Sequence, residues 1–221
     1  MSSAPRPTAR RGRGRPSSPV LTPDGITAAA VRLLEERGQD GLTMAALARR
    51  LEVAPSALYN HVATKQDVLR AVQDHVNRGI DCAGFATLPW DEALAAWARS
   101  YRGAYARHPA LVAVIAVTPV RSAPHTVAMY ERVSAGLLTA GWPAEEVANV
   151  VVAVESFVLG SALDTQAPPD IFDPGDLADS APAFTAANAA RPAGDTAHAA
   201  FELGLDALLA GLRARLGRLG G

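Results

Sequence analysis

The stretch GLTMAALARRLEVAPSALYNHVATKQDVL, residues 41–69, contains two short amphipathic segments separated by a tight turn. In the first, residues 43–51, apolar side chains recur at i, i+3, i+4 and i+7, which predicts a helix. The second, about residues 55–61, opens with Pro55, and proline suits the first turn of a helix. Two helices at this separation predict a helix-turn-helix, in which the second helix enters the DNA major groove.

The second helix has a thin apolar stripe, Leu58 and Val62, that would hold it on its partner helix. Its other side chains are suited to DNA, because Asn bonds an adenine edge and Ser and Tyr bond phosphates. Lys65 opens the next helix, where an ammonium group and free backbone N–H groups favour a phosphate. An ordinary solvated surface helix is the alternative. The predicted contacts are Pro55, Ser56, Ala57, Tyr59, Asn60, His61 and Lys65.

Charge is unevenly distributed along the 221 residues. Residues 1–80 carry 12 Lys and Arg against 7 Asp and Glu, whereas residues 81–221 carry 9 against 15. Residues 1–20 hold five arginines and no acid, and their Pro, Gly and Ser content predicts a disordered arm. We expect this arm, including Arg13 and Arg15, to add minor-groove or backbone contacts to DNA.

The remaining pattern predicts an all-α fold with two units. Residues 21–68 form the helix-turn-helix unit and continue into a connecting helix to about residue 80. Residues 85–221 form a larger helical unit for ligand binding and dimerisation. Its predicted helices are 89–107, 110–117, 123–140, 143–161 and 195–216, and the Pro- and Ala-rich segment 165–194 is predicted to be a mobile loop.

Composition argues against several classes of protein. One cysteine, Cys82, permits no internal disulfide, and a reducing compartment therefore fits best. The apolar runs are shorter than the roughly 18 residues of a membrane span. We expect a cytoplasmic, non-enzymatic protein with no metal, cofactor or membrane partner, because the sequence has no metal-binding, nucleotide-binding or triad motif. A helical enzyme with a helix-turn-helix-like start is the alternative from another class.

An aromatic stripe in the larger unit is the main candidate for a ligand site. Trp97, Tyr101, Tyr105 and His108 lie at i, i+4, i+8 and i+11, with His108 as a possible polar anchor. The same stripe is equally the core face of an amphipathic helix. Met129, Val133, Phe157 and Ser161 are further candidates on neighbouring helices.

Residues 41–69 resemble the DNA-binding domain of TetR-family repressors. The family pattern has a Thr opening the second helix, then LA..LGV....LY.HV..K..L, and this chain matches it from Thr43 to Leu69. The resemblance adds Thr43 to the expected DNA contacts. Glu52 departs from the pattern, since the family usually has a Gly there, often with a left-handed backbone.

The C-terminal half resembles the tetracycline-repressor branch of this family, through FVLGSALD, residues 157–164, and the loop after it. This implies a repressor that a small molecule releases from a palindromic operator, and a dimer built as a four-helix bundle. A constitutive regulator or an activator with no open pocket is the alternative. The residues expected at the dimer interface are Val147, Val151, Val154, Val158, Leu205, Leu208 and Leu212.

The same resemblance bears on the ligand. Ile115 falls where that branch has a metal-ligating His, whereas Thr118 matches a ligand-side Thr. Isoleucine has no lone pair to give a cation. We therefore expect an apolar or aromatic effector rather than a magnesium-chelated drug, with Ile115 and Thr118 in its site.

Overall fold

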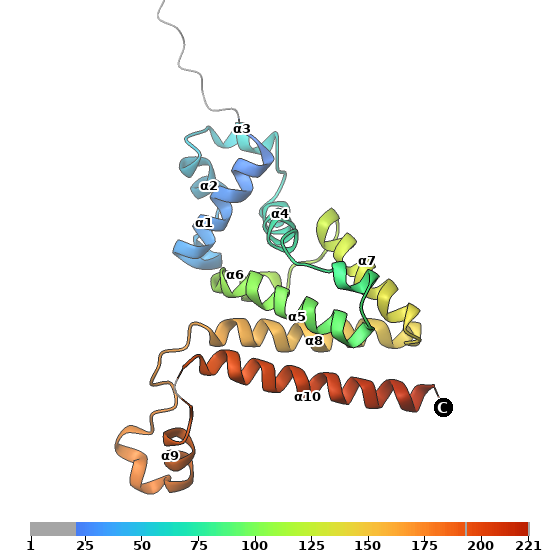
Figure 1. Ribbon diagram of the computed structural model, residues 1–221. Helices are drawn as coiled ribbons and strands as arrows, with labels where there is room; N and C mark the ends of the chain where they lie inside the picture. The colour runs from blue at the N-terminus through green and yellow to red at the C-terminus, as the bar shows by residue number, and fades with distance from the viewer. Residues whose placement is uncertain (1–20, 193, 221) are drawn as a thin grey trace, which may run out of the picture.

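The computed structural model describes residues 21–192 and 194–220, and these are all helical or irregular with no strand, as the all-α prediction requires. The predicted arm, with Arg13 and Arg15, lies outside the described residues. The elements, shown in Figure 1, are α1 Pro23–Gly41, α2 Met44–Arg50, α3 Pro55–Tyr59, α4 Lys65–Asn77, η1 Ala83–Ala86, α5 Trp90–Ala106, α6 Pro109–Ile115, α7 Pro124–Thr139, α8 Ala144–Asp164, η2 Gly175–Ser180, α9 Pro182–Ala189 and α10 Thr196–Leu219.

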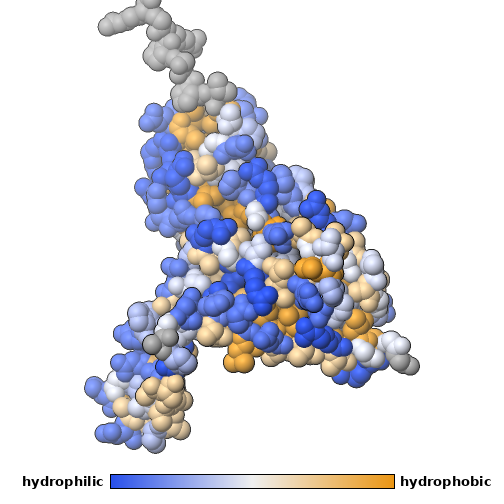
Figure 2. All heavy atoms as spheres, in the orientation of Figure 1, coloured by the Kyte–Doolittle hydropathy of each residue, from blue (hydrophilic) through white to orange (hydrophobic). Residues whose placement is uncertain are grey.

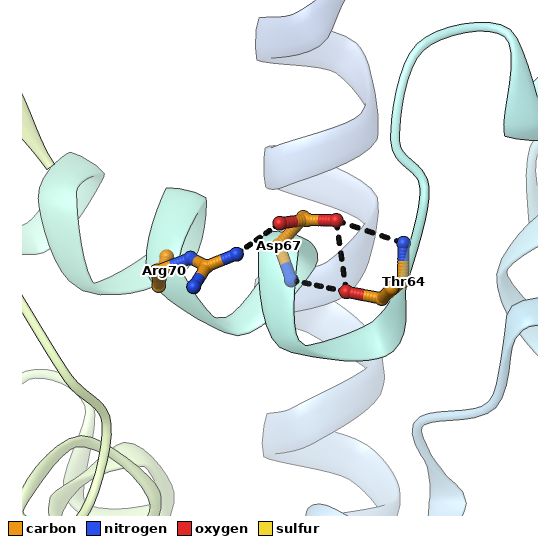
Figure 3. A network of polar contacts seen from close by, with 3 residues as sticks. All are labelled: Thr64, Asp67 and Arg70. Atoms are coloured by element: carbon orange, nitrogen blue, oxygen red, sulfur yellow. Dashed lines mark hydrogen bonds and ion pairs between the residues drawn. The ribbon is translucent and has the colours of Figure 1, made fainter. Parts of the chain in front are cut away.

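Helices α1 to α4 form a head at one end of the molecule (Figure 1). Three of its helices begin with a threonine whose hydroxyl accepts a backbone N–H three residues on: Thr22, Thr43 and Thr64. At α4 the cap is reciprocal, because Asp67 accepts the backbone N–H of Thr64 at 2.9 Å and also contacts Arg70 (Figure 3). These local bonds fix where the helices begin.

Glu52, where the family pattern usually has glycine, lies in the turn between α2 and α3. Glu52 has φ of 55°, so it keeps the left-handed backbone that favours glycine, although it has a side chain. Helix α3 is shorter than predicted and ends at Tyr59, with Asn60 as its C-cap. The connecting helix α4 likewise ends at Asn77, earlier than predicted, and a short η1 follows.

Helices α5 to α8 and α10 form a body in which α5 and α8 pack together at the centre. Helix α10 packs on α8 and α5, and the two long helices α8 and α10 lie side by side along the lower edge in Figure 1. Helix α4 links the units, since it packs on α1 in the head and on α5, α6 and α7 in the body. One continuous hydrophobic core runs through both units.

The segment predicted to be a mobile loop, residues 165–194, is partly helical over its described residues 165–192. They contain η2 and α9, which project away from the body in Figure 1. Phe172 and Phe184 pack edge to face with ring centroids 6.3 Å apart, and Arg191 lies over Phe172. Helices this short complete too few turns to leave a readable period in the sequence.

Helix α8 is long and apolar enough, by composition, to cross a membrane, with a mean hydropathy of 1.6. Its neighbours supply a simpler reason for that composition. It packs against α5, α6, α7 and α10, and it carries Glu145, Glu146 and Glu155. This is the setting of a central core helix in a helical body.

Candidate DNA-binding surface and ligand cavity

The outer face of α3 is built as the helix-turn-helix pattern predicts. Leu58 is fully buried and Val62 is partly buried, so this stripe anchors the helix. Tyr59 is 52% exposed, and Asn60 and His61 beside it are also exposed. The other predicted contacts on this end of the head are Thr43, Pro55 and Ser56, which are exposed, and Ala57, which is partly buried.

Two cations of the head already have internal partners. The Lys65 ammonium group donates to the backbone carbonyl of Gln39 at 2.9 Å, which ties α4 to the end of α1. The expected phosphate contact of Lys65 therefore competes with a structural role. Arg50 forms a two-pronged ion pair with Glu36 at 2.6 Å, whereas its neighbour Arg49 is exposed at the end of α2.

The aromatic stripe is mostly core rather than ligand site. Trp97 and Tyr105 are fully buried, and the Tyr105 hydroxyl donates to Asn77 of α4 at 2.6 Å. His108 was misassigned as the polar anchor, because its Nδ1 lies 2.6 Å from Glu35 of α1. Helix α5 ends at Ala106, so the helical period no longer applies at residue 108.

Four further candidates also lie away from an open cavity. Met129 and Val133 are buried in the core. Phe157 stacks on Phe201 between α8 and α10, with ring centroids 5.5 Å apart. Ser161 accepts a hydrogen bond from Arg102 at 2.9 Å. These side chains therefore hold helices together.

A cavity of about 410 Å³ lies where α4, α5, α7 and α8 meet the segment after α6. Three predicted ligand residues do line it: Tyr101, Ile115 and Thr118. Its other walls come from Gln73, Ala116, Val120, Tyr130, Val152, Glu155, Ser156 and Leu159. Its size is within the range of small-molecule sites.

Gln73 connects this cavity to the head. It belongs to α4, is 3% exposed, and donates from Nε2 to the backbone carbonyl of Thr118 at 3.2 Å. That bond fixes the amide orientation and leaves Oε1 buried without a hydrogen-bond partner in the described part of the chain. Below it, Asn77 of α4 also donates to Thr126 of α7 at 3.1 Å.

Among the described residues, Glu155 is the only carboxylic acid of the cavity wall. The Tyr130 hydroxyl donates to it at 2.5 Å. Burial raises the pKa of Glu155 above its usual value, although hydrogen bonds from Tyr130 and Tyr101 act in the opposite direction. Burial also raises the pKa of both tyrosines, so their hydroxyls stay neutral donors.

The sequence analysis missed Gln73, Tyr130 and Glu155, although two of them leave a signal. Glu155 interrupts the apolar run of α8, and Gln73 occupies a position on the apolar face of α4 between Leu69 and Val76. A polar residue at a core position of an amphipathic helix needs a partner inside the protein. Here it marks the cavity.

A larger cavity of about 830 Å³ lies between η1 and the end of α7, beside Cys82 and Arg132. None of its lining residues comes from α4, so it has no direct link to the head. Over residues 21–192 and 194–220, no three His, Cys, Asp or Glu side chains gather in a way that could hold a metal ion.

The residues predicted for a dimer interface are mostly buried inside this chain. Val147, Val151, Val154, Val158, Leu205 and Leu212 are buried, and Leu208 is partly buried. An apolar period alone cannot distinguish a chain's own core from a surface for a second copy. The apolar side chains that α8 and α10 expose are different ones, including Val152, Leu163 and Leu203.

Fold and site together define a helix-turn-helix regulator with a helical ligand-binding body, and comparisons with known proteins agree. The family model for bacterial regulatory proteins, tetR family, matches residues 26–72. The model for the tetracyclin repressor-like C-terminal domain matches residues 87–216. The chain belongs to the TetR family of bacterial regulatory proteins.

Individual relatives are regulators. A helix-turn-helix-type transcriptional regulator of Saccharopolyspora erythraea is 34% identical over 145 residues, which is 66% of this chain and 61% of that protein. The chain spans about three fifths of the length of the first curated relatives it matches. The class A tetracycline repressor from transposon 1721 of Escherichia coli is 32% identical and matches 88% of this chain and 92% of that protein.

Among solved structures, ActR of Streptomyces coelicolor in complex with actinorhodin superposes with a TM-score of 0.71 and 28% identity. The match covers 89% of this chain and 99% of that one. The similarity therefore extends through both the head and the body.

Proposed function

We propose that this protein is a cytoplasmic, homodimeric transcriptional repressor that a small molecule releases from a palindromic DNA operator. The exposed face of α3 supports the DNA part, since Tyr59 and Asn60 lie beside each other on a helix held by Leu58. Side chains of this kind read base edges when their helix lies in the major groove. The names of the relatives point the same way.

The observation that carries the ligand part is the position of Gln73. It is on the last helix of the head and also in the wall of a cavity inside the body. Contacts between a ligand and Gln73 would stabilise some placements of helix α4 more than others. Release from DNA then requires tighter ligand binding to the arrangement that does not fit the operator.

The proposed dimer uses the outer faces of α8 and α10. Leu203 is 75% exposed, and the small residues Ala207, Ala210 and Ala214 continue its stripe along α10 at helical spacing. Leu163 at the end of α8 is exposed as well. Figure 2 shows apolar atoms at the surface of this lower side of the body. Two copies joined there would present two α3 helices to successive half-sites.

The direct test is selection of DNA from a random pool by the full-length protein, followed by footprinting. A site with two-fold symmetry and half-sites about 10 base pairs apart is expected, because a symmetric dimer reads one helical turn per subunit. Recovery of no enriched sequence would contradict the proposal.

A further inference from the structure

The wall of the cavity near Gln73 is acidic rather than basic. Over residues 21–192 and 194–220, this wall includes one carboxyl group, Glu155, and no lysine, arginine or histidine. Gln73 adds a buried carbonyl oxygen, Oε1, without a hydrogen-bond partner in the described residues. Glu155 therefore offers a ligand a hydrogen-bond acceptor, beside the Ser156 hydroxyl, which can donate or accept.

The orientation of these acceptors is fixed by hydrogen bonds to other residues of the cavity wall. The amide of Gln73 is held by its bond to the backbone of Thr118, so Oε1 cannot exchange places with the donor nitrogen without losing that bond. Glu155 is held by the Tyr130 hydroxyl. A site with preset acceptors loses little ordering entropy when a ligand binds.

Aromatic and apolar side chains form the rest of the wall. Tyr101 and Tyr130 come from two different helices, and Ile115, Val152 and Leu159 complete the surface. Aromatic faces attract cations as well as other rings. Residues 81–221 carry 9 basic against 15 acidic side chains, so the unit around the cavity also favours a cation over an anion.

From these observations we infer that the effector is an arylalkylamine in its protonated form, whose ammonium group binds Glu155 and whose ring packs on the tyrosines. This inference rests on the proposed function, because it takes this cavity as the effector site. The sequence analysis predicts an apolar or aromatic effector, and this inference adds that the effector carries a positive charge.

A bound ammonium group would also give the carboxyl group of Glu155 a charged partner inside the cavity. In the empty cavity the raised pKa of Glu155 favours its neutral form, which is compatible with burial. An ammonium group at hydrogen-bond distance favours the carboxylate, and the resulting charge-assisted bond is stronger than a neutral one.

The test is isothermal titration calorimetry of the full-length protein at pH 7 with three probes of the same shape: naphthylmethylammonium, naphthalenemethanol and naphthoate. The ammonium probe is expected to bind the wild type about tenfold more tightly than the alcohol, since one charge-assisted hydrogen bond separates them. The naphthoate probe is expected to bind most weakly.

A matched pair of variants assigns the preference to one residue. Glu155→Gln keeps the shape of the side chain and is expected to lower the affinity for the ammonium probe about tenfold while leaving the affinity for the alcohol within about twofold. Glu145→Gln, which removes an exposed acid from the first turn of the same helix, is expected to change neither. Unchanged binding of the alcohol shows that the cavity of the Glu155 variant remains intact.

The possible failures are distinct. Equal binding of ammonium and alcohol, tighter binding of naphthoate, or an ammonium preference that survives in Glu155→Gln would overturn the inference about charge. Absence of binding by all three probes would overturn it too. Selection of operator DNA, which needs no probe, tests the proposed function separately.

Discussion

The head and the body are stabilised by polar contacts of different range. In the head, Thr22, Thr43 and Thr64 cap helices through bonds to residues three positions away. In the described part of the body, α5 to α8 begin without a side-chain cap, whereas Asp195 caps α10, and several polar contacts join distant helices, as Tyr130 and Glu155 do. The head can therefore be inferred from short sequence patterns, whereas the functional residues of the body emerge only when the chain is folded.

The largest predicted effect concerns the proposed dimer interface on the surface of the body. Leu203→Arg places charges in the proposed interface, which is expected to cost several kcal/mol of association energy because a buried charge there has no partner. Sedimentation is expected to show a monomer with unchanged helical content. Leu138→Arg, at an exposed leucine of α7, is the control and is expected to remain dimeric. A dimeric Leu203→Arg protein would contradict the assignment.

The second prediction concerns the contacts of α4 between the head and the body. Asn77 is 2% exposed, accepts from Tyr105 and donates to Thr126, so Asn77→Ala leaves two buried hydroxyls without their partner. A loss of about 2–4 kcal/mol in the free energy of unfolding is expected from the unsatisfied groups. Urea denaturation measures it. A loss below about 1 kcal/mol would show that the joint tolerates water.

Glu155 is expected to reduce the stability of the empty body at neutral pH. Its pKa is raised by burial, and the groups that face it, Tyr101 and Tyr130, are neutral. As pH rises above the usual glutamate value, the unfolded chain loses this proton before the folded one, so stability falls. Glu155→Gln is therefore expected to melt at a higher temperature than wild type at pH 7, and the difference is expected to shrink toward pH 4. A difference that grows toward pH 4 would contradict the raised pKa.

The smallest effect belongs to the turn of the head. Glu52 has φ of 55°, which strains a residue with a Cβ by about 1–2 kcal/mol, whereas glycine loses about 0.5–1 kcal/mol through unfolded-state entropy. Glu52→Gly is expected to raise stability by about 0.5–1 kcal/mol. Glu52→Ala keeps the Cβ and is expected to give no such gain. Equal stability of both variants would show that the turn is not strained.

The sequence analysis succeeded where the evidence was local. The residues Thr64 and Asp67 have the three-residue spacing typical of a reciprocal cap, and the structure has this cap at the start of α4. The two apolar residues expected to hold α3 in the head face inward: Leu58 is buried, and Val62, just after the end of α3, is partly buried.

The sequence analysis failed where the role of a residue depends on contacts between helices that are distant in the sequence. His108 was placed on the aromatic face by counting residues, but the helix ends two residues earlier and the ring pairs with Glu35 in the head. Val151 and Leu205 have the apolar character of an interface, yet they fill the core of their own chain. Glu155 was passed over because its partner, Tyr130, is 25 residues away on another helix.

The central claim is that α3 reads DNA sequence, and the most direct measurement compares specific with non-specific DNA affinity for Asn60→Ala and Tyr59→Ala. Both side chains are exposed, so folding is expected to be unaffected. Each variant is expected to lose about 1–3 kcal/mol of affinity for the selected operator and little affinity for random DNA. Asn149→Ala, at an exposed asparagine of α8, is expected to match wild type on both. Unchanged operator affinity in both α3 variants would contradict the account.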